Sequence, residues 1–525
     1  MIALRRIAAH PFFQSLLLGG IAACGFEPLA LWPLALLAIA CLIELTARAE
    51  SWKRAALIGW FFGIGHFTIG NNWIATAFTY QANMPQWLGF IAVVLLSLYL
   101  AVYPALATLG GWLLARRGGQ ARLPLVMGFA ACWIITEWLR SWVFTGYAWN
   151  PLAMAALGPF ARPGLAAAAP WLGTYALSGL VALLGGTWLL AWHRRKRKVV
   201  AAVLALVPVA LFLLPSLAGT PAQGTLRFTL VQPDIRQESL DDPTQFVAQF
   251  RKAADLSGPL TPQQPRLVLW PESGVPFYLA TGYPRYFYAA GDYEVDPLLV
   301  RRAIGEAIGP GGMLLTGAVD LEVKQGNPIA ARNVITAVAA DGSLAGSYAK
   351  AHLVPYGEYL PLRWLLEPLG ATRLVPGALD FWPGPGPRTV DLGAWGKAGM
   401  QICYEIVFSG QVVDRQNRPD YIFNPSNDGW FGSFGPPQHL AQARLRAIEE
   451  GLPVLRATTT GISAVIDADG IVRQHIPRHV ASRLDGYVPP AHAPTLFART
   501  GNMLPLGWAA ALLVLCLVAL RRRGG

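Results

Sequence analysis

Charged residues are scarce in this chain: they make up 14% of its 525 residues, whereas 54% are hydrophobic. Such a composition is too apolar for two ordinary soluble domains. The second half is nevertheless too polar for a transporter built only of membrane helices. We therefore expect one membrane part and one globular part.

Cysteine is also rare, and its distribution excludes a disulfide framework. Cys24, Cys41, Cys132 and Cys516 all lie in long apolar segments, which leaves Cys403 alone in a polar region. The sequence contains no internal repeat, no glycine-rich loop for phosphate and no Cys/His set with metal-ligand spacing. We accordingly expect neither a metal nor a cofactor.

Long apolar runs fill residues 1–218 and 499–525. A run of about 20 apolar residues can cross a bilayer, and by this measure the sequence predicts about eight transmembrane helices. They lie near 11–24, 29–46, 55–78, 87–114, 123–143, 171–192, 199–217 and 504–520. The first run could also be a signal segment with Cys24 as a lipidated residue, but another apolar run follows at once without a polar tether.

Basic residues fall in every second connection between these runs. Because cytoplasmic loops are enriched in Lys and Arg, we assign these connections to the cytoplasm and the polar region after the seventh run to the opposite side. The formal charge of +12 then requires no nucleic-acid partner. The basic connections contain Arg5 and Arg6; Arg48, Lys53 and Arg54; Arg116, Arg117 and Arg122; residues 194–198; and Arg521, Arg522 and Arg523.

Several polar residues lie inside the apolar runs, where hydrocarbon makes them costly. We expect them to face the interior of the bundle or an interface. Glu137 and Arg140 are three positions apart on one helical face, which favours an ion pair. The others are Glu44, His66, Asn71 and Asn72.

From about residue 219 to 498 the pattern changes to short β-branched runs separated by Gly, Pro and Asp turns. It predicts strands at 226–232, 267–270, 313–319, 333–339, 398–402, 421–424, 454–457 and 462–467, and helices at 243–256, 297–308 and 438–451. This alternation predicts an α/β domain with a mixed sheet.

Three apolar runs in this region each end in one ionisable residue. WPES contains Glu272, YAKAHLVPYGEYLP begins just before Lys350, and QICYE contains Cys403. A carboxylate can take the thiol proton, and an ammonium can favour the thiolate and then an oxyanion, so these residues suffice for nucleophilic catalysis without histidine. A lone cysteine after a strand can also be a small buried hydrophobe, but the two similar strand ends favour the catalytic interpretation.

These three motifs, in this order and at these separations, resemble the Glu-Lys-Cys signature of the carbon-nitrogen hydrolase (nitrilase) superfamily. The resemblance implies an α-β-β-α sandwich with Glu272 as general base and Cys403 as nucleophile. The nucleophile needs a pKa well below the free value of about 8.5 to be a thiolate at neutral pH, and we expect the adjacent Lys350 to supply that shift.

A nitrilase-like domain hung between membrane helices is similar to the membrane-embedded apolipoprotein N-acyltransferase branch of that superfamily. This resemblance implies transfer of an acyl chain from a phospholipid, through a cysteine thioester, to the amino-terminal amine of a diacylglyceryl-cysteine lipoprotein. It also implies a multi-pass monomer of the bacterial inner membrane, with residues 219–498 as a periplasmic catalytic domain.

Further site residues follow from the same resemblance. Glu358 matches the family's second glutamate, expected to orient Lys350 and the substrate nucleophile, and Glu405 matches another acidic position of the acyltransferase branch. Either carboxylate could instead be a cap of a turn or strand end. The backbone amide of Tyr404, next to the nucleophile, is a natural oxyanion donor.

Aromatic residues crowd the loops after these positions, and we expect Trp430 among them to contact substrate. Amphipathic rings favour a bilayer surface, although rings of this kind can also fill the domain core. They are Phe277, Tyr278, Tyr283, Tyr286, Phe287, Tyr288, Trp364, Trp430, Phe431 and Phe434. At 239–243 this chain reads SLDDP where the resemblance implies a tryptophan, so one aromatic contact is in doubt.

Two alternative functions use different parts of the chain. A membrane-tethered amidase or nitrilase would cleave small amides with the same Glu272, Lys350 and Cys403, and would not need the aromatic loops. A non-enzymatic scaffold or transporter would need none of these three residues. If phospholipid acylated Cys403, the scaffold would be excluded. Transfer of the acyl group to an amine rather than to water would then distinguish the acyltransferase from the amidase.

Overall fold

The computed structural model describes residues 10–80, 85–116, 121–213, 223–258, 264–290, 293–369 and 379–524. The chain divides into two compact units. The helical unit comprises Met1–Leu217, Ser433–Glu449 and Pro494–Gly525, and the α/β unit comprises Ala218–Gly432 and Glu450–Ala493. Residues 433–449 thus belong to the helical unit although strands precede and follow them in the sequence.

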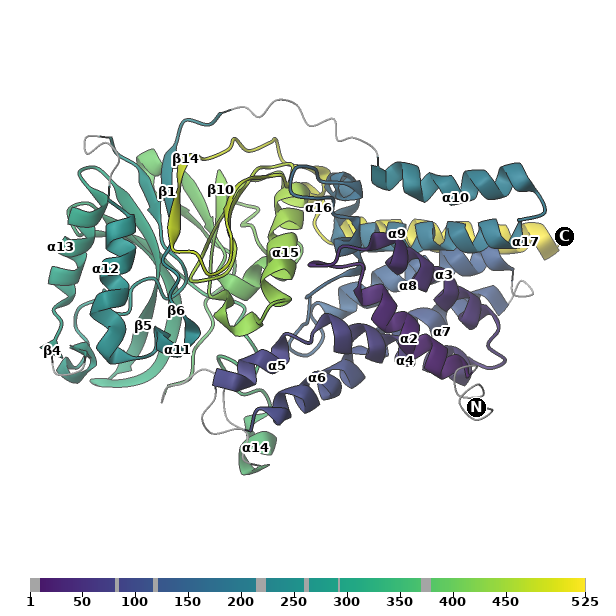
Figure 1. Ribbon diagram of the computed structural model, residues 1–525, viewed down its shortest axis with the longest axis horizontal. Coiled ribbons are helices and arrows are strands. Elements are labelled where there is room, and N and C mark those ends of the chain that lie inside the picture. Colours follow the sequence, from purple (N-terminus) through teal and green to yellow (C-terminus); the bar gives the residue numbers. More distant parts are fainter. Residues whose placement is uncertain are drawn as a thin grey trace. The chain divides into compact units, whose positions relative to one another are not determined.

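Every predicted apolar run contains helix (Figure 1). The helices are α2 (Pro11–Ala23), α3 (Trp32–Ala47), α4 (Trp52–Gly70), α5 (Ile74–Ala77), α6 (Trp87–Leu100), α7 (Val102–Arg116), α8 (Arg122–Arg140), α9 (Ala169–His193), α10 (Lys198–Leu213) and α17 (Met503–Gly524). The run 55–78 is not one helix, because the chain leaves the helix between α4 and α5 at the Asn71-Asn72 pair.

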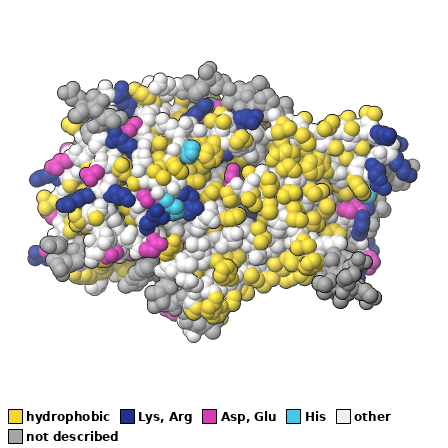
Figure 2. All heavy atoms as spheres, in the orientation of Figure 1, with side chains coloured by type: hydrophobic (Ala, Val, Ile, Leu, Met, Phe, Trp, Pro, Cys, Tyr) yellow, Lys and Arg dark blue, Asp and Glu magenta, His cyan; other side chains and the backbone are white. Residues whose placement is uncertain are grey.

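Four helical stretches among the described residues are long and apolar enough to cross a membrane: Trp87–Arg116, Arg122–Arg140, Leu165–His193 and Met503–Arg521. The helices α2, α3 and α10 are apolar but shorter. Figure 2 shows hydrophobic side chains gathered over the helical unit, with Lys and Arg at the end where α17 terminates. Phe90 is 70% exposed and Val199 78% exposed, as expected for side chains that face lipid.

Close packing within the helical unit depends on small residues. A Cβ atom on Gly19 of α2 would lie 2.0 Å from the carbonyl oxygen of Phe62, and one on Gly65 of α4 would lie 2.0 Å from that of Leu16. Only glycine therefore allows the two backbones to approach this closely.

The polar residues of the bundle face inward, with one exception. Glu137 and Arg140 are buried, and their Oε1 and Nη2 atoms lie 3.8 Å apart, which confirms the predicted pair. His66 and Asn71 are also buried, whereas Asn72 is exposed because it lies in the turn after α4. Glu44 accepts hydrogen bonds from Arg48 (2.8 Å) and Arg122 (3.0 Å).

The α/β unit contains two six-stranded mixed sheets, in the orders β14-β1-β2-β5-β6-β7 and β13-β12-β11-β10-β9-β8, and a two-stranded β3-β4 ribbon. Strands β1, β2 and β5 are parallel, as are β9, β10 and β11. The first sheet comprises β1 (Arg227–Gln232), β2 (Leu267–Leu269), β5 (Met313–Lys324), β6 (Asn327–Ala339), β7 (Leu344–Ala349) and β14 (Ser482–Tyr487). The second comprises β8 (Thr389–Asp391), β9 (Lys397–Met400), β10 (Tyr421–Ser426), β11 (Val454–Thr458), β12 (Ser463–Ile466) and β13 (Val472–Ile476).

Two amphipathic helices, α12 (Phe246–Leu256) and α13 (Pro297–Ile308), pack against the first sheet. Ala253 and Ile304 share a buried apolar cluster with Val231, Trp270 and Leu314. Glu272 follows β2 and Cys403 follows β9, so both residues lie just beyond the ends of parallel strands. The remaining α-helices and strands are α11 (Gln237–Leu240), α14 (Arg363–Leu366), α15 (Gly435–Glu450), α16 (Leu496–Thr500), β3 (Ala289–Ala290) and β4 (Tyr293–Glu294).

Candidate active site

Cys403 lies in a strained turn after β9. Its φ angle is +50°, a left-handed conformation that non-glycine residues rarely adopt and that is enriched at functional sites. Asn424 of the neighbouring strand β10 holds this turn, because its Nδ2 donates to the carbonyl oxygens of Gln401 (2.7 Å) and Cys403 (3.4 Å). The cysteine is 5% exposed.

Lys350 follows β7 and lies between two carboxylates. Its Nζ is 2.9 Å from Oε1 of Glu358 and 3.5 Å from Oε1 of Glu272, and all three side chains are at least nine-tenths buried. The backbone amide of Asn427 donates to the other oxygen of Glu272 (2.7 Å). The sequence motifs that end in Glu272 and Lys350 therefore meet at one place, with Glu358 beside them.

Cys403 lies within electrostatic range of this ion cluster. Burial alone would lower the pKa of Lys350, but the Coulombic attraction of Glu358, Glu272 and Cys403 outweighs it and raises that pKa above its ordinary value. The lysine is therefore an ammonium at any pH at which the protein would work.

The expectation that Lys350 holds Cys403 as a thiolate at neutral pH is wrong. Burial and the negative charge of Glu272 raise the pKa of the Cys403 thiol well above its ordinary value, and the lowering effect of Lys350 only partly offsets them. The thiol is therefore neutral in the resting protein. Its proton must leave during the reaction, which calls for a general base.

Glu405 ties the cysteine turn to the segment that follows Lys350. Its Oε1 accepts hydrogen bonds from Tyr348 Oη (2.8 Å) and from the amides of Ala351 (2.7 Å) and His352 (3.1 Å), and its Oε2 accepts one from the amide of Ile402 (2.7 Å). Burial raises the pKa of Glu405 to about 7, although these donors oppose the shift. The carboxylate joins the first sheet to the second.

Tyr404 and Trp430 occupy different surroundings. Tyr404 is buried, and its ring contacts Phe408 edge-on at 5.0 Å. Trp430 lies half-buried in the turn Asp428–Phe431 that follows β10. Of the other aromatic residues, Tyr286 is 64% and Trp364 75% exposed.

Many rings in the loop after Glu272 contact one another. Tyr278 contacts Tyr283 (5.6 Å) and Phe287 (6.0 Å), and Tyr283 stacks on Tyr288 at 6.1 Å. The aromatic set therefore divides between a packed cluster and exposed rings.

Two sets of polar residues near the site were not predicted from the sequence. Nδ2 of Asn333 donates to Oε1 of both Glu272 (2.8 Å) and Glu358 (3.1 Å). Arg456 of β11 is fully buried, and its Nη2 donates to both carboxylate oxygens of Asp428 at 2.8 Å. The available signals were Asn333 and Arg456, which are polar residues within predicted strands, but the sequence does not identify their partners.

Asn333 provides a test of this geometry. Asn333→Asp would place a third carboxylate against Glu272 and Glu358, whereas Asn333→Leu would only remove the donor. Because a hydrogen bond to a charged group contributes about 1.5 kcal/mol, we expect Asn333→Leu to reduce acylation of Cys403 roughly tenfold, and Asn333→Asp to reduce it further. Single-turnover rates with a chromogenic ester measure this. An aspartate variant as active as the asparagine protein would contradict the bridging role.

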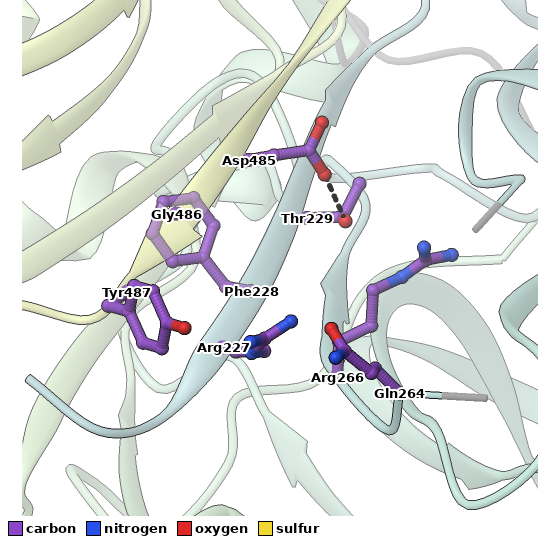
Figure 3. A pocket seen from close by; sticks show the side chains of 8 residues that line it. All are labelled: Arg227, Phe228, Thr229, Gln264, Arg266, Asp485, Gly486 and Tyr487. Carbon is purple, nitrogen blue, oxygen red and sulfur yellow. Dashed lines mark hydrogen bonds between the residues drawn. The ribbon is translucent and has the colours of Figure 1, made fainter. Parts of the chain in front are cut away.

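No group of three or more His, Cys, Asp or Glu residues within the described ranges could hold a metal ion. A separate pocket lies at the β14-β1-β2 side of the first sheet (Figure 3). Thr229 donates to Asp485 there at 2.6 Å, and Arg227 and Arg266 line it. None of the candidate catalytic residues lines this pocket.

Two family models match different parts of the chain. The family model described as the apolipoprotein N-acyltransferase N-terminal domain matches residues 18–187, and the model described as carbon-nitrogen hydrolase matches residues 227–478. The fold and site thus define a membrane protein with several apolar helices and a nitrilase-like α/β domain with two mixed sheets.

Curated relatives match nearly the whole chain. The chain is 34% identical to an apolipoprotein N-acyltransferase of Rhodopseudomonas palustris, over 97% of this chain and 95% of that protein. It is likewise 34% identical to one of Bradyrhizobium diazoefficiens, over 96% and 94%. The chain belongs to the apolipoprotein N-acyltransferase family. Among solved structures, it is similar to Saccharomyces cerevisiae Nit3 of the nitrilase superfamily, with 17% identity, 52% of this chain and 93% of that chain covered, and a TM-score of 0.36.

Proposed function

We propose that this chain transfers an acyl chain in two steps through Cys403. The sulfur attacks the ester carbonyl of a phospholipid, a thioester forms and a lysophospholipid leaves. The amino-terminal amine of a diacylglyceryl-cysteine lipoprotein then attacks the thioester, giving an amide and the free thiol. The observation that carries this proposal is the buried cluster of Glu272, Lys350 and Glu358 beside a strained cysteine.

Glu272 is the general base in the first step. Because the resting thiol is neutral, Glu272 takes its proton as sulfur attacks, and then gives that proton to the departing lysophospholipid oxygen. In the second step it takes a proton from the attacking amine and returns it to the sulfur. The hydrogen bonds from Asn333 and Asn427 fix both of its oxygens for these transfers.

Lys350, held by Glu358, stabilises negative charge on the reacting groups, and neither residue transfers protons. The ammonium of Lys350, with the backbone amide of Tyr404, stabilises the oxyanion of each tetrahedral intermediate. Glu358 holds that ammonium at 2.9 Å and, through Val354 N (2.7 Å), is itself fixed in its loop. Trp430, Tyr286 and Trp364 are proposed to contact the lipid substrates.

The surroundings of the catalytic domain favour lipid substrates over small amides. We assign that domain to residues 219–498, as an α-β-β-α sandwich between the helices of 1–218 and 499–525. About eight of the helices span the bacterial inner membrane in this proposal, and the protein acts as a monomer with its catalytic domain in the periplasm. Exposed rings such as Trp364 have little use in a soluble amidase and suit a bilayer interface.

Mass spectrometry of the purified protein tests the proposed reaction. After mixing with phospholipid, we expect an added acyl mass on Cys403. When a diacylglyceryl lipopeptide with a free amine is then added, the acyl mass should disappear from Cys403 and appear on the lipopeptide. Transfer to water in the presence of the lipopeptide would instead indicate a membrane-tethered amidase, and no acyl mass at all would reject both enzymes.

Reporter fusions test the proposed sidedness. A reporter active only in the periplasm should be active when fused near Thr220, which lies outside the described residues, and inactive when fused after Arg195. The reason is that basic residues, as in 194–198, are retained on the cytoplasmic side. The reverse pattern would place the catalytic domain in the cytoplasm and remove its access to exported lipoproteins.

A further inference from the structure

Helix α15 is buried along its length from Gln438 to Glu450, although it is rich in polar and charged side chains. Burying charges without partners costs several kcal/mol, so these side chains must have specific contacts. The buried polar residues of α15 are Gln438, His439, Gln442, Arg444, Arg446, Glu449 and Glu450.

Arg444 inserts into a loop of the helical unit. The loop 157–164 is closed by a backbone bridge between Leu157 and Gly164. The guanidinium of Arg444, which is 1% exposed, donates to three of its carbonyl oxygens: those of Gly158 (2.8 Å), Pro159 (2.9 Å) and Arg162 (3.0 Å). Only an arginine presents several donors in one plane for such a set of acceptors.

A second buried contact holds the C-terminal half of α15. Arg446 Nε lies 2.8 Å from Oε1 of Glu449, and both side chains are at most 1% exposed. Thr174 of α9 donates to Oε2 of Glu449 at 2.6 Å and also accepts from Arg446. The helix is therefore fixed to the rest of the helical unit at two separate places.

Both ends of α15 continue into segments that hold the candidate active site. The segment before it contains Asn427, whose amide donates to Glu272, and Asp428, which pairs with Arg456. Arg456 lies on β11, just after α15. The chain on each side of α15 is therefore covalently attached to groups that position Glu272 and the cysteine turn.

We propose that Arg444 is a positioning residue for acyl transfer from membrane lipid. Its contact with the loop 157–164 anchors α15, and α15 is joined covalently to the segments that lead out of β10 and into β11, so the anchor restrains both segments. This restraint matters for a donor lipid, because the bilayer limits where its ester can go. It matters little for a soluble ester, which diffuses freely to Cys403. The inference rests on the proposed function, since it takes Cys403 as the acylated residue.

Comparing a membrane donor with a soluble donor tests this role. The full-length protein would be reconstituted into vesicles of phosphatidylethanolamine and phosphatidylglycerol, and thioester formation on Cys403 followed by mass spectrometry. The soluble donor is p-nitrophenyl butyrate, followed by release of p-nitrophenol. We expect Arg444→Met to slow acylation by vesicle lipid about tenfold, because small displacements are costly in acyl transfer, and to change acylation by the soluble ester less than about twofold.

Arg444→Lys keeps the charge but loses the planar set of donors, so its loss with vesicle lipid should be smaller than that of Arg444→Met. Thr174→Val removes one hydroxyl at the second contact and should show the same lipid-selective loss. If Arg444→Met does not fold, Thr174→Val is the variant that tests the lipid-selective loss. The control is Arg499→Met, because Arg499 is an exposed arginine of the helical unit. This substitution should leave the rates with both donors unchanged.

Equal losses with both donors would show a general structural role and overturn the proposal, as would unchanged rates with both. If the unmutated protein formed no thioester with either donor, the proposed function itself would fail. That outcome is distinct from loss of selectivity between the two donors.

Discussion

Replacing Cys403 with serine should stop acyl-enzyme formation and reduce turnover by at least about 10⁴-fold. Burial and Glu272 already raise the pKa of the thiol, and the same surroundings would oppose a serine alkoxide much more strongly. His352, in the segment that follows Lys350, stacks on Phe408 at 4.2 Å, and burial lowers its pKa. The measurement is the intact-protein mass after incubation with phospholipid.

The other four cysteines provide matched controls for this substitution. None of them lies in the α/β unit, so replacing each with alanine should leave turnover largely intact. Near-normal turnover of Cys403→Ser would disprove the assignment of the nucleophile. Loss of the acyl mass in one of the control variants would point to a different cysteine. The controls are Cys24, Cys41, Cys132 and Cys516.

Much of the fold could be predicted because its signals are local. A long apolar run must be helical to satisfy its own backbone, and helix occurs in all eight runs. Strands β13 (VRQHI) and β14 (SRLDGY) were not predicted, since they are polar and only partly buried. They lie at the edges of the two sheets, where the apolar alternation that indicates a strand is weak.

The sequence motifs predicted that Glu272 and Lys350 lie at one site, but not which other polar residues surround them. Glu272 and Lys350 meet as expected, because each follows a strand of the first sheet. Asn333 and the Asp428–Arg456 pair were missed, since their importance depends on partners far along the chain. The pKa of Cys403 was predicted in the wrong direction because a sequence gives no measure of burial, and burial is its largest cause.

Helix α15 lies where the sequence predicts a helix, but its polar side chains are buried. The sequence predicts it at 438–451, close to its observed bounds. Its charged residues would ordinarily indicate a solvated face. In the structure Arg444 and Arg446 are instead buried within the helical unit, and only the three-dimensional contacts with the loop 157–164 and Thr174 reveal this.

Lys350→Met should reduce acylation of Cys403 roughly a hundredfold. The substitution removes a preorganised oxyanion donor, which contributes about 3 kcal/mol to the transition state. It also removes a positive charge that lowers the pKa of the Cys403 thiol. Because only the thiolate reacts with iodoacetamide, alkylation of this variant should require a higher pH than alkylation of the unmutated protein.

Glu272→Gln separates the role of the base from that of the charge. Glu272 raises the pKa of Cys403, so its neutral replacement should move alkylation to lower pH, while acylation by phospholipid still falls because the base is gone. The two variants should therefore shift the alkylation profile in opposite directions although both lose activity. Labelling of Cys403 against pH in detergent measures both shifts. If Lys350→Met and the unmutated protein gave the same profile, the lysine would not tune the thiol, and its role would be limited to the oxyanion.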